Sequence, residues 1–136
     1  MTPKQAGNRA VMERRKDTMD PFMQAAIDEA RAGLSEGGIP IGSVLVQGGK
    51  IIGRGHNRRV QQGDPILHAE IDCLRNAGRI GSYVDTVLYS TLMPCPLCSG
   101  AAVLFKIPKV IVGESRTFAG APDCPGWTQE HKMVSG

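Results

Sequence analysis

Residues 86–113 read TVLYSTLMPCPLCSGAAVLFKIPKVIVG, and this stretch decides the fold. Residues 86–91 and 109–113 are predicted strands, and the small apolar run 95–105 that follows Pro94 is a predicted helix. A connection of this length joins two parallel strands by a right-handed crossover. The sequence therefore predicts an α/β unit whose cysteines lie at the carboxyl end of a strand, where open α/β sheets bind ligands.

The rest of the chain extends this unit to a three-layer α/β/α domain with a mixed central sheet. Asp20 is a predicted N-cap for a helix that begins at Pro21, shows apolar residues at helical spacing and ends at a Gly-Gly pair. A second Gly-Gly pair separates the predicted strands 41–47 and 50–55, which indicates a hairpin with a turn of positive φ. Another helix is predicted over residues 66–77.

Two short motifs supply a set of zinc ligands and one carboxylate outside that set. They are His68-Ala69-Glu70 and the pair Cys95 and Cys98. One imidazole and two thiolates fill three of the four tetrahedral positions of Zn²⁺, which leaves the last position for a water that the metal makes acidic near neutral pH. His68, Cys95 and Cys98 are therefore predicted zinc ligands, and Glu70 is the predicted proton carrier.

Each half of this pattern has a plainer interpretation when it is taken alone. A Cys-x-x-Cys pair is also a redox or structural zinc motif, and His-x-Glu by itself carries little information. Together the two halves are the signature by which zinc-dependent nucleobase deaminases are recognised. Both also fall near the starts of predicted helices, where unpaired N–H groups and the helix dipole stabilise thiolates. The combination favours a catalytic zinc site.

From residue 22 to residue 118 the chain resembles the cytidine deaminase-like superfamily, and within it the small cytosine deaminases of fungi and some bacteria. The zinc motifs are shared by the whole superfamily. The resemblance implies a cytidine deaminase-like fold, a homodimer, and zinc-dependent conversion of cytosine to uracil and ammonia. It is carried by EGGIPIG (36–42), GRGHN (53–57), LHAEI (67–71), TLMPC (91–95), SGA (99–101) and the stretch 112–118.

The resemblance also implies roles for individual pocket residues. Asn57 would hydrogen-bond the pyrimidine ring, the backbone around Ala69 would meet the ring carbonyl oxygen, and the main-chain carbonyl of Met93 would lie near the departing amino group. On the residues alone, Asn57 is equally well a turn former. Ile41 and Phe118 are expected either to line a flat pocket or to belong to the core.

Composition and charge indicate one domain and a small substrate. The chain has 136 residues, 41% of them hydrophobic, which supports a single core. Residues 1–19 form a predicted flexible basic arm that accounts for the whole formal net charge of +3, so the remainder is neutral. Without a basic face we expect a nucleobase substrate and no nucleic-acid partner. Neither a membrane-spanning run nor a secretory signal is evident, so we expect a cytoplasmic protein.

The end of the chain departs from the pattern of related cytosine deaminases, which continue with a fifth strand and a helix that closes over the base. Residues 119–136 are rich in Gly and Pro and show no helical or strand period, so we expect an irregular tail after a 20–118 deaminase domain. Trp127 would either stack on the base or cover exposed core. Alternatives to cytosine deamination are therefore a deaminase of guanine or tRNA adenosine, and an inactive zinc-bearing fold.

Two cysteines remain outside the predicted ligand set. Cys73 falls within the predicted helix 66–77 and is most simply a core residue, and Cys124 lies in the tail. Because the chain is expected to be cytoplasmic, both are predicted to be free thiols.

Overall fold

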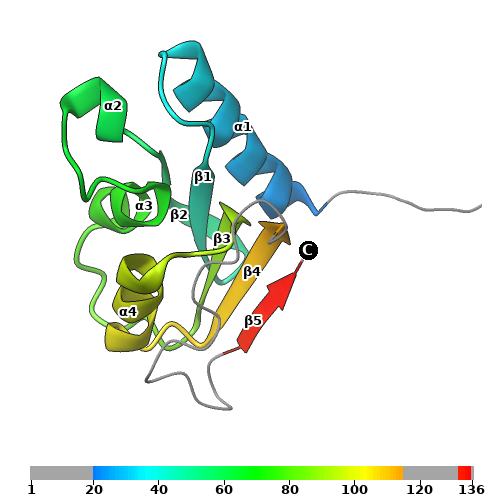
Figure 1. Cartoon of the computed structure of the whole chain (residues 1–136). Helices are drawn as coiled ribbons and strands as arrows, with labels where there is room; N and C mark the ends of the chain where they lie inside the picture. Colours follow the sequence, from blue (N-terminus) through cyan, green and yellow to red (C-terminus); the bar gives the residue numbers. More distant parts are fainter. Residues whose placement is uncertain (1–19, 115–131, 136) are drawn as a thin grey trace, which may run out of the picture.

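The computed structural model describes residues 20–114 and 132–135 (Figure 1). Its longest helix has 15 residues, and none of the helices within the described ranges has the length and apolar character needed to cross a membrane. In chain order the elements are α1 (Pro21–Ser35), β1 (Gly42–Gln47), β2 (Lys50–His56), α2 (Arg59–Gln62), α3 (Ala69–Ala77), β3 (Thr86–Leu92), α4 (Pro96–Leu104), β4 (Lys109–Glu114) and β5 (Lys132–Ser135).

The strands form one mixed sheet in the order β2-β1-β3-β4-β5. β1 pairs with β2 and β3 in antiparallel fashion, whereas β4 pairs with β3 and β5 in parallel. α1 covers one face of this sheet, and α3 and α4 cover the other (Figure 1). The predicted three-layer α/β/α architecture with a mixed sheet is confirmed.

The sheet separates two apolar cores, because successive side chains of a strand point to opposite faces. Along β1, Val44 and Val46 pack on the α1 side and Leu45 packs on the α3 and α4 side. The first core also contains Met23, Ala26 and Tyr89. The second is larger and contains Leu45, Cys73, Leu74, Leu88, Met93, Ala102, Ile107, Val110 and Val112.

The first helix and the hairpin form for the reasons visible in the sequence. Asp20 is the N-cap of α1, where its Oδ1 accepts a hydrogen bond from the Phe22 N–H at 2.8 Å. Pro21 is the first helical residue, a position at which no N–H is needed. Gly48 and Gly49 have φ values of 58° and 77°, so both adopt the left-handed conformation that a tight hairpin turn requires.

The parallel crossover is also confirmed. β3 and β4 pair in register from Val87 opposite Lys109 onward, and α4 connects them. α4 begins at Pro96, so Cys95 occupies the N-cap position at the carboxyl end of β3. The crossover therefore delivers both cysteines of the motif to one end of the sheet.

α3 begins at Ala69, three residues later than the predicted helix start at residue 66. The delay has a local cause, since Oδ1 of Asp64 accepts a hydrogen bond from the Ile66 N–H at 3.0 Å and holds this segment in a turn. His68 consequently lies at the N-cap of α3 rather than inside the helix.

The expectation that residues 119–136 contain no strand is wrong for the last few residues of this segment. Lys132–Ser135 forms β5, which pairs in parallel with β4 from Lys109 opposite Lys132 to Val112 opposite Ser135. Four residues are too few to show a strand period, and the pairing is templated by the open edge of β4. Phe118, Cys124 and Trp127 lie outside the described residues, as does the predicted basic arm, residues 1–19.

The backbone of α1 packs closely against β1 at Gly42. This packing predicts that a larger residue at position 42 destabilises the protein. A Cβ at Gly42 would overlap the Ala26 carbonyl oxygen and lie 2.6 Å from the Ala30 nitrogen, both of them backbone atoms of α1. We expect Gly42→Ala to lower the free energy of unfolding by about 1–3 kcal/mol through overpacking, as measured by urea denaturation.

Gly100 within α4 is the matched control for this substitution. A Cβ there would meet no described atom within 4 Å beyond its own helix, so Gly100→Ala should raise stability by about 0.5–1 kcal/mol through helix propensity. A Gly42→Ala protein as stable as the wild type would contradict the close packing of α1 on the sheet.

Candidate active site

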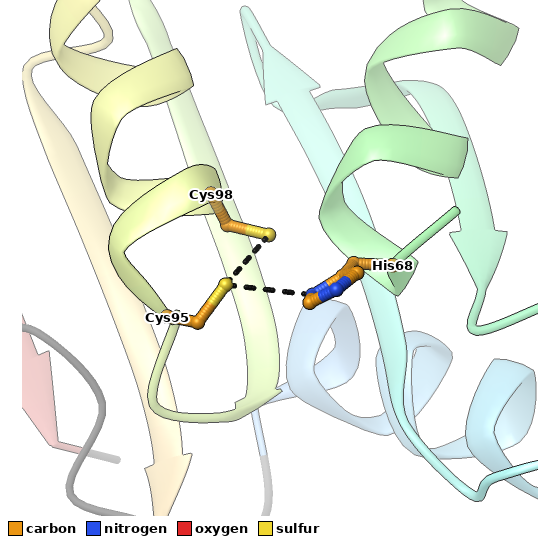
Figure 2. A group of neighbouring side chains, drawn as sticks. All are labelled: His68, Cys95 and Cys98. Atoms are coloured by element: carbon orange, nitrogen blue, oxygen red, sulfur yellow. Dashed lines mark hydrogen bonds between the residues drawn. The ribbon is translucent and has the colours of Figure 1, made fainter. Parts of the chain in front are cut away.

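Two helix starts bring three potential metal ligands together. His68 is the N-cap residue of α3, Cys95 is the N-cap residue of α4, and Cys98 lies in the first turn of α4. Figure 2 shows the three side chains pointing toward one another from these two helices. Nδ1 of His68 lies 3.5 Å from Sγ of Cys95, which lies 3.9 Å from Sγ of Cys98. The ligand atoms all lie within 4.8 Å of one another.

Two of these separations match those around a tetrahedral zinc ion. With Zn–S distances of about 2.3 Å and Zn–N distances of about 2.0–2.1 Å, tetrahedral angles place two sulfurs about 3.8 Å apart and a sulfur and a nitrogen about 3.6 Å apart. The observed S···S distance of 3.9 Å and N···S distance of 3.5 Å are close to both values. The donor set of one imidazole and two thiols could therefore hold Zn²⁺ and leave one coordination position to another ligand.

The charge environment favours a cation at this place. Burial raises the pKa of the Cys98 thiol well above its usual range, and the neighbouring Glu70 and Cys95 raise it further. A bound divalent ion reverses this effect, because a coordinated thiol loses its proton. Cys73, on the helix that His68 precedes but outside the cluster, is fully buried in the core as predicted, and burial raises its pKa to about 12. Cys73 is thus an inert thiol.

Glu70 is a buried carboxyl group beside the cluster. It is the second residue of α3 and only 4% exposed. Burial raises its pKa above the usual range, and hydrogen bonds from its own backbone and from Ser90 offset part of this effect. A carboxyl group whose pKa is raised in this way is better suited to take up and release a proton than an exposed one.

Ser90 on β3 can accompany Glu70 in both protonation states. Its Oγ lies 2.9 Å from Oε2 of Glu70 and 2.8 Å from the carbonyl oxygen of Leu92. A hydroxyl has one proton to donate and two lone pairs to accept. It therefore donates to the ionised Glu70 carboxylate, or donates to the Leu92 carbonyl while it accepts the proton of the neutral acid.

A cavity of about 200 Å³ opens beside Glu70 and the ligand cluster. Four residues that the sequence assigned to a substrate pocket line it, namely Ile41, Asn57, Ala69 and Met93. The sequence interpretation missed three further wall residues, of which two lie within the stretches 36–42 and 91–95 and the third lies two residues after Asn57. These are Ile39, Arg59 and Leu92.

Asn57 both stabilises a turn and lines the cavity. It is 3% exposed, its N–H donates to the Ile41 carbonyl oxygen at 2.9 Å, and its Oδ1 accepts from the Arg59 N–H at 3.0 Å. The side chain is therefore fixed as a turn former while it lines the cavity. Because the backbone already engages the amide oxygen, the amide nitrogen is the atom available to donate to a bound ring.

Comparison with known proteins gives two kinds of curated relative. The chain is 44% identical over 101 residues to the cytosine deaminase of Candida albicans, a match that covers 72% of this chain and 67% of that protein. It is 45% identical over 105 residues to a tRNA-specific adenosine deaminase of Streptococcus pyogenes serotype M18, covering 75% of this chain and 66% of that protein. The chain thus spans about two thirds of the length of these relatives.

A solved structure and a family model agree with these similarities. The structure comes from studies of A-to-I editing by tRNA:A34 deaminases at the wobble position of transfer RNA. It superposes with a TM-score of 0.76 at 31% identity and covers 85% of this chain and 97% of that one. Residues 16–114 match the model of the cytidine and deoxycytidylate deaminase zinc-binding region. The chain belongs to this family of zinc deaminases, within the cytidine deaminase-like superfamily.

Proposed function

We propose that this protein is a zinc-dependent hydrolase that converts cytosine to uracil and ammonia, with His68, Cys95 and Cys98 holding the ion. The position of Glu70 carries the proposal. This buried carboxyl group lines the same cavity as His68 and Cys95 and does not belong to the donor set. Three ligands with a separate proton carrier, arranged around one cavity, suit the hydrolysis of a ring amino group.

Glu70 performs the proton transfers in this proposal. The ion's contribution is to activate a water molecule as the nucleophile that attacks C4. Glu70 takes the proton from that water and delivers it to the ring nitrogen N3. It then transfers the proton of the hydroxyl group added at C4 to the amino group, so that the C4 carbonyl of uracil forms and neutral ammonia departs in place of an amide anion. Ser90 holds Glu70 in place through both states.

The other cavity residues would hold the base. We assign Asn57 to a hydrogen bond with the ring, the backbone at Ala69 to the ring carbonyl oxygen, and the main-chain carbonyl of Met93 to the departing amino group. Ile41 supplies an apolar wall. Phe118 keeps its predicted place as a further wall residue, although it lies outside the described part of the chain.

Charge and size support a free base as the substrate. Residues 20–114 carry nine basic and nine acidic side chains, so this part of the chain has no surplus of positive charge. Arg54 is paired with Glu29, and Arg58 is paired with Asp72. RNA binding depends on Lys and Arg that neutralise phosphates. The cavity of about 200 Å³ is also smaller than the sites of drug-sized ligands, which suits a single ring system.

Deamination of adenosine in tRNA is the second candidate. It is favoured by the 45% identity to the streptococcal enzyme and by the structural match of 0.76 in TM-score. Arg59 lines the cavity and is exposed, so it would be available to a phosphate that follows a flipped-out base. The two candidates differ in a measurable way, because tRNA binding depends steeply on salt and binding of a neutral base does not.

We also propose that the protein is a homodimer, as the resemblance to cytosine deaminases implies. Three large apolar side chains at or just beyond the α4 helix are exposed in the single chain, which is consistent with a partner that covers them. They are Leu97, Leu104 and Phe105, with exposed fractions of 44%, 73% and 39%.

A substrate panel separates the candidate functions. Purified zinc-loaded protein is assayed for ammonia release from cytosine, guanine, adenine and cytidine, and for inosine formation in tRNA. We expect release from cytosine, with a rate that changes little between low and moderate salt. Activity on tRNA alone, lost steeply as salt rises, would replace cytosine by the second candidate.

Glu70→Gln tests the proton carrier. The amide keeps the size of the side chain and can still accept from Ser90, but it cannot carry a proton between water and ring. Because a positioned acid or base contributes about 10²–10⁴-fold and this residue serves both transfers, we expect kcat to fall by at least about 10³-fold. Metal analysis should still find one zinc per chain. Turnover within tenfold of the wild type would remove Glu70 from the mechanism.

Cys98→Ser tests the ligand set, and Cys73→Ala is its matched control. Both cysteines are buried, but only Cys98 belongs to the cluster. We expect Cys98→Ser to lose most of its zinc on dialysis against a chelator that leaves the wild type and Cys73→Ala loaded. Equal zinc retention in the two variants would show that Cys98 is not a ligand.

A further inference from the structure

The two residues that flank Asn57 are both tied to one carboxylate on α3. Oδ2 of Asp72 accepts a hydrogen bond from the His56 N–H at 3.1 Å and another from Nε of Arg58 at 3.0 Å. Asp72 is 1% exposed, so this carboxylate is buried behind the wall that Asn57 presents to the cavity. One buried oxygen thus accepts two hydrogen bonds, one of them from a charged guanidinium. These bonds fix the chain on both sides of Asn57.

The close approach of α3 to β2 makes this contact possible. A Cβ at Gly55 would lie 2.5 Å from the Cys73 nitrogen and 2.6 Å from Oδ2 of Asp72. Only glycine at this position lets the helix backbone come near enough for the short Asp72 side chain to reach the main chain of β2. The contact is therefore built into the packing of the helix on the strand.

A second set of bonds holds the same turn from the side of α1. The His56 ring lies between a carboxylate of α1 and the carboxylate of its C-cap residue, with Nδ1 2.9 Å from Oε1 of Glu29 and Nε2 2.9 Å from Oε1 of Glu36. Nε2 of Gln61 donates to Oε1 of Glu36 at 3.1 Å and to the Asn57 carbonyl oxygen at 3.3 Å. The backbone at Asn57 is thus also held through Gln61 of α2, which is itself bonded to the C-cap residue of α1.

Asp72 belongs to the helix that carries the catalytic groups. It lies two residues after Glu70, and its own N–H donates to the carbonyl oxygen of His68 at 2.8 Å. A helix of this kind is rigid over one turn. The Asp72 carboxylate therefore connects Asn57, the residue assigned to the base, with α3. That helix carries Glu70, assigned to proton transfer, and begins directly after His68, assigned to zinc.

We propose that Asp72 is a positioning residue that sets the place of the Asn57 amide relative to Glu70. The inference rests on the proposed function, in which Asn57 binds the base and Glu70 protonates it. Catalysis requires these two groups to be held in one geometry about the ring, and a small displacement weakens binding of the base. Asp72 supplies the rigid link across the boundary between β2 and α3.

Asp72→Asn tests the link at constant size. An amide oxygen in the place of Oδ2 can still accept from both His56 and Arg58, but the negative charge that pairs with the Arg58 guanidinium is lost and the link is weakened. We expect KM for cytosine to rise about tenfold, as the loss of one well-placed hydrogen bond to the base predicts, while kcat changes by less than about threefold. Melting temperature and zinc content are recorded for each protein.

Asn76→Ala is the matched control. Nδ2 of Asn76 donates to the Arg54 carbonyl oxygen at 2.8 Å, which is also a side-chain link from α3 to the backbone of β2. It lies one helical turn further from the site and flanks no cavity residue. We expect Asn76→Ala to lower the melting temperature with KM unchanged. A KM that rises equally in both variants would show that general loosening of α3, and not Asp72, is responsible.

Arg58→Leu and the side-chain amide signals of Asn57 complete the test. If Asp72 acts partly through Arg58, Arg58→Leu should also raise KM, and the double variant should be no worse than Asp72→Asn alone. In ¹⁵N spectra, the Asn57 NH₂ pair should be single and sharp in the wild type and Asn76→Ala, and broadened or doubled in Asp72→Asn. Unchanged signals and unchanged KM would overturn the proposal.

The two readouts separate this inference from the proposed function. A wild-type protein without deaminase activity would refute the function, and the Asn57 signals would still test the positioning by Asp72. An active wild type with an undisturbed Asn57 in Asp72→Asn would refute the positioning alone.

Discussion

The starts of two helices must meet at one cation, and the rest of the structure depends on this constraint. His68 and Cys95 occupy the N-cap positions of α3 and α4, yet neither side chain makes a capping hydrogen bond. Asp, Ser or Asn at these positions would stabilise each helix by about 1 kcal/mol. The chain lacks that stabilisation and directs an imidazole and a thiol at a common point instead, and binding of the proposed ion would offset the loss. The crossover between β3 and β4 then fixes where that point lies.

Two buried carboxyl groups lie on one turn of α3, and their different hydrogen-bond partners suit them to different roles. One oxygen of Asp72 accepts hydrogen bonds from a guanidinium and from a backbone N–H, which ties this carboxyl group to the neighbouring strand. Glu70 lies within hydrogen-bond distance of the Ser90 hydroxyl, and that group can accept as readily as donate. The first arrangement suits a fixed structural link. The second suits a group that gains and loses a proton in each turnover.

The sequence predicted the elements and the chemistry more fully than the contacts between them. Helical and strand periods, the Gly-Gly turn and the spacing of His68, Glu70, Cys95 and Cys98 are local patterns, and the structure brings these four residues together. β5 was missed because four residues show no period and the strand forms by pairing with an existing edge. The link from Asp72 to Arg58 was missed because it depends on how closely α3 packs on β2.

The central claim is that three protein ligands hold zinc and that the fourth position is open to water. X-ray absorption at the zinc edge of the loaded protein measures the ligand set directly. The account predicts two sulfur ligands at about 2.3 Å and two nitrogen or oxygen ligands at about 2.0–2.1 Å. A third sulfur, supplied by Cys124 or by a second chain, would close the coordination sphere. That result would contradict a catalytic site and favour a structural zinc.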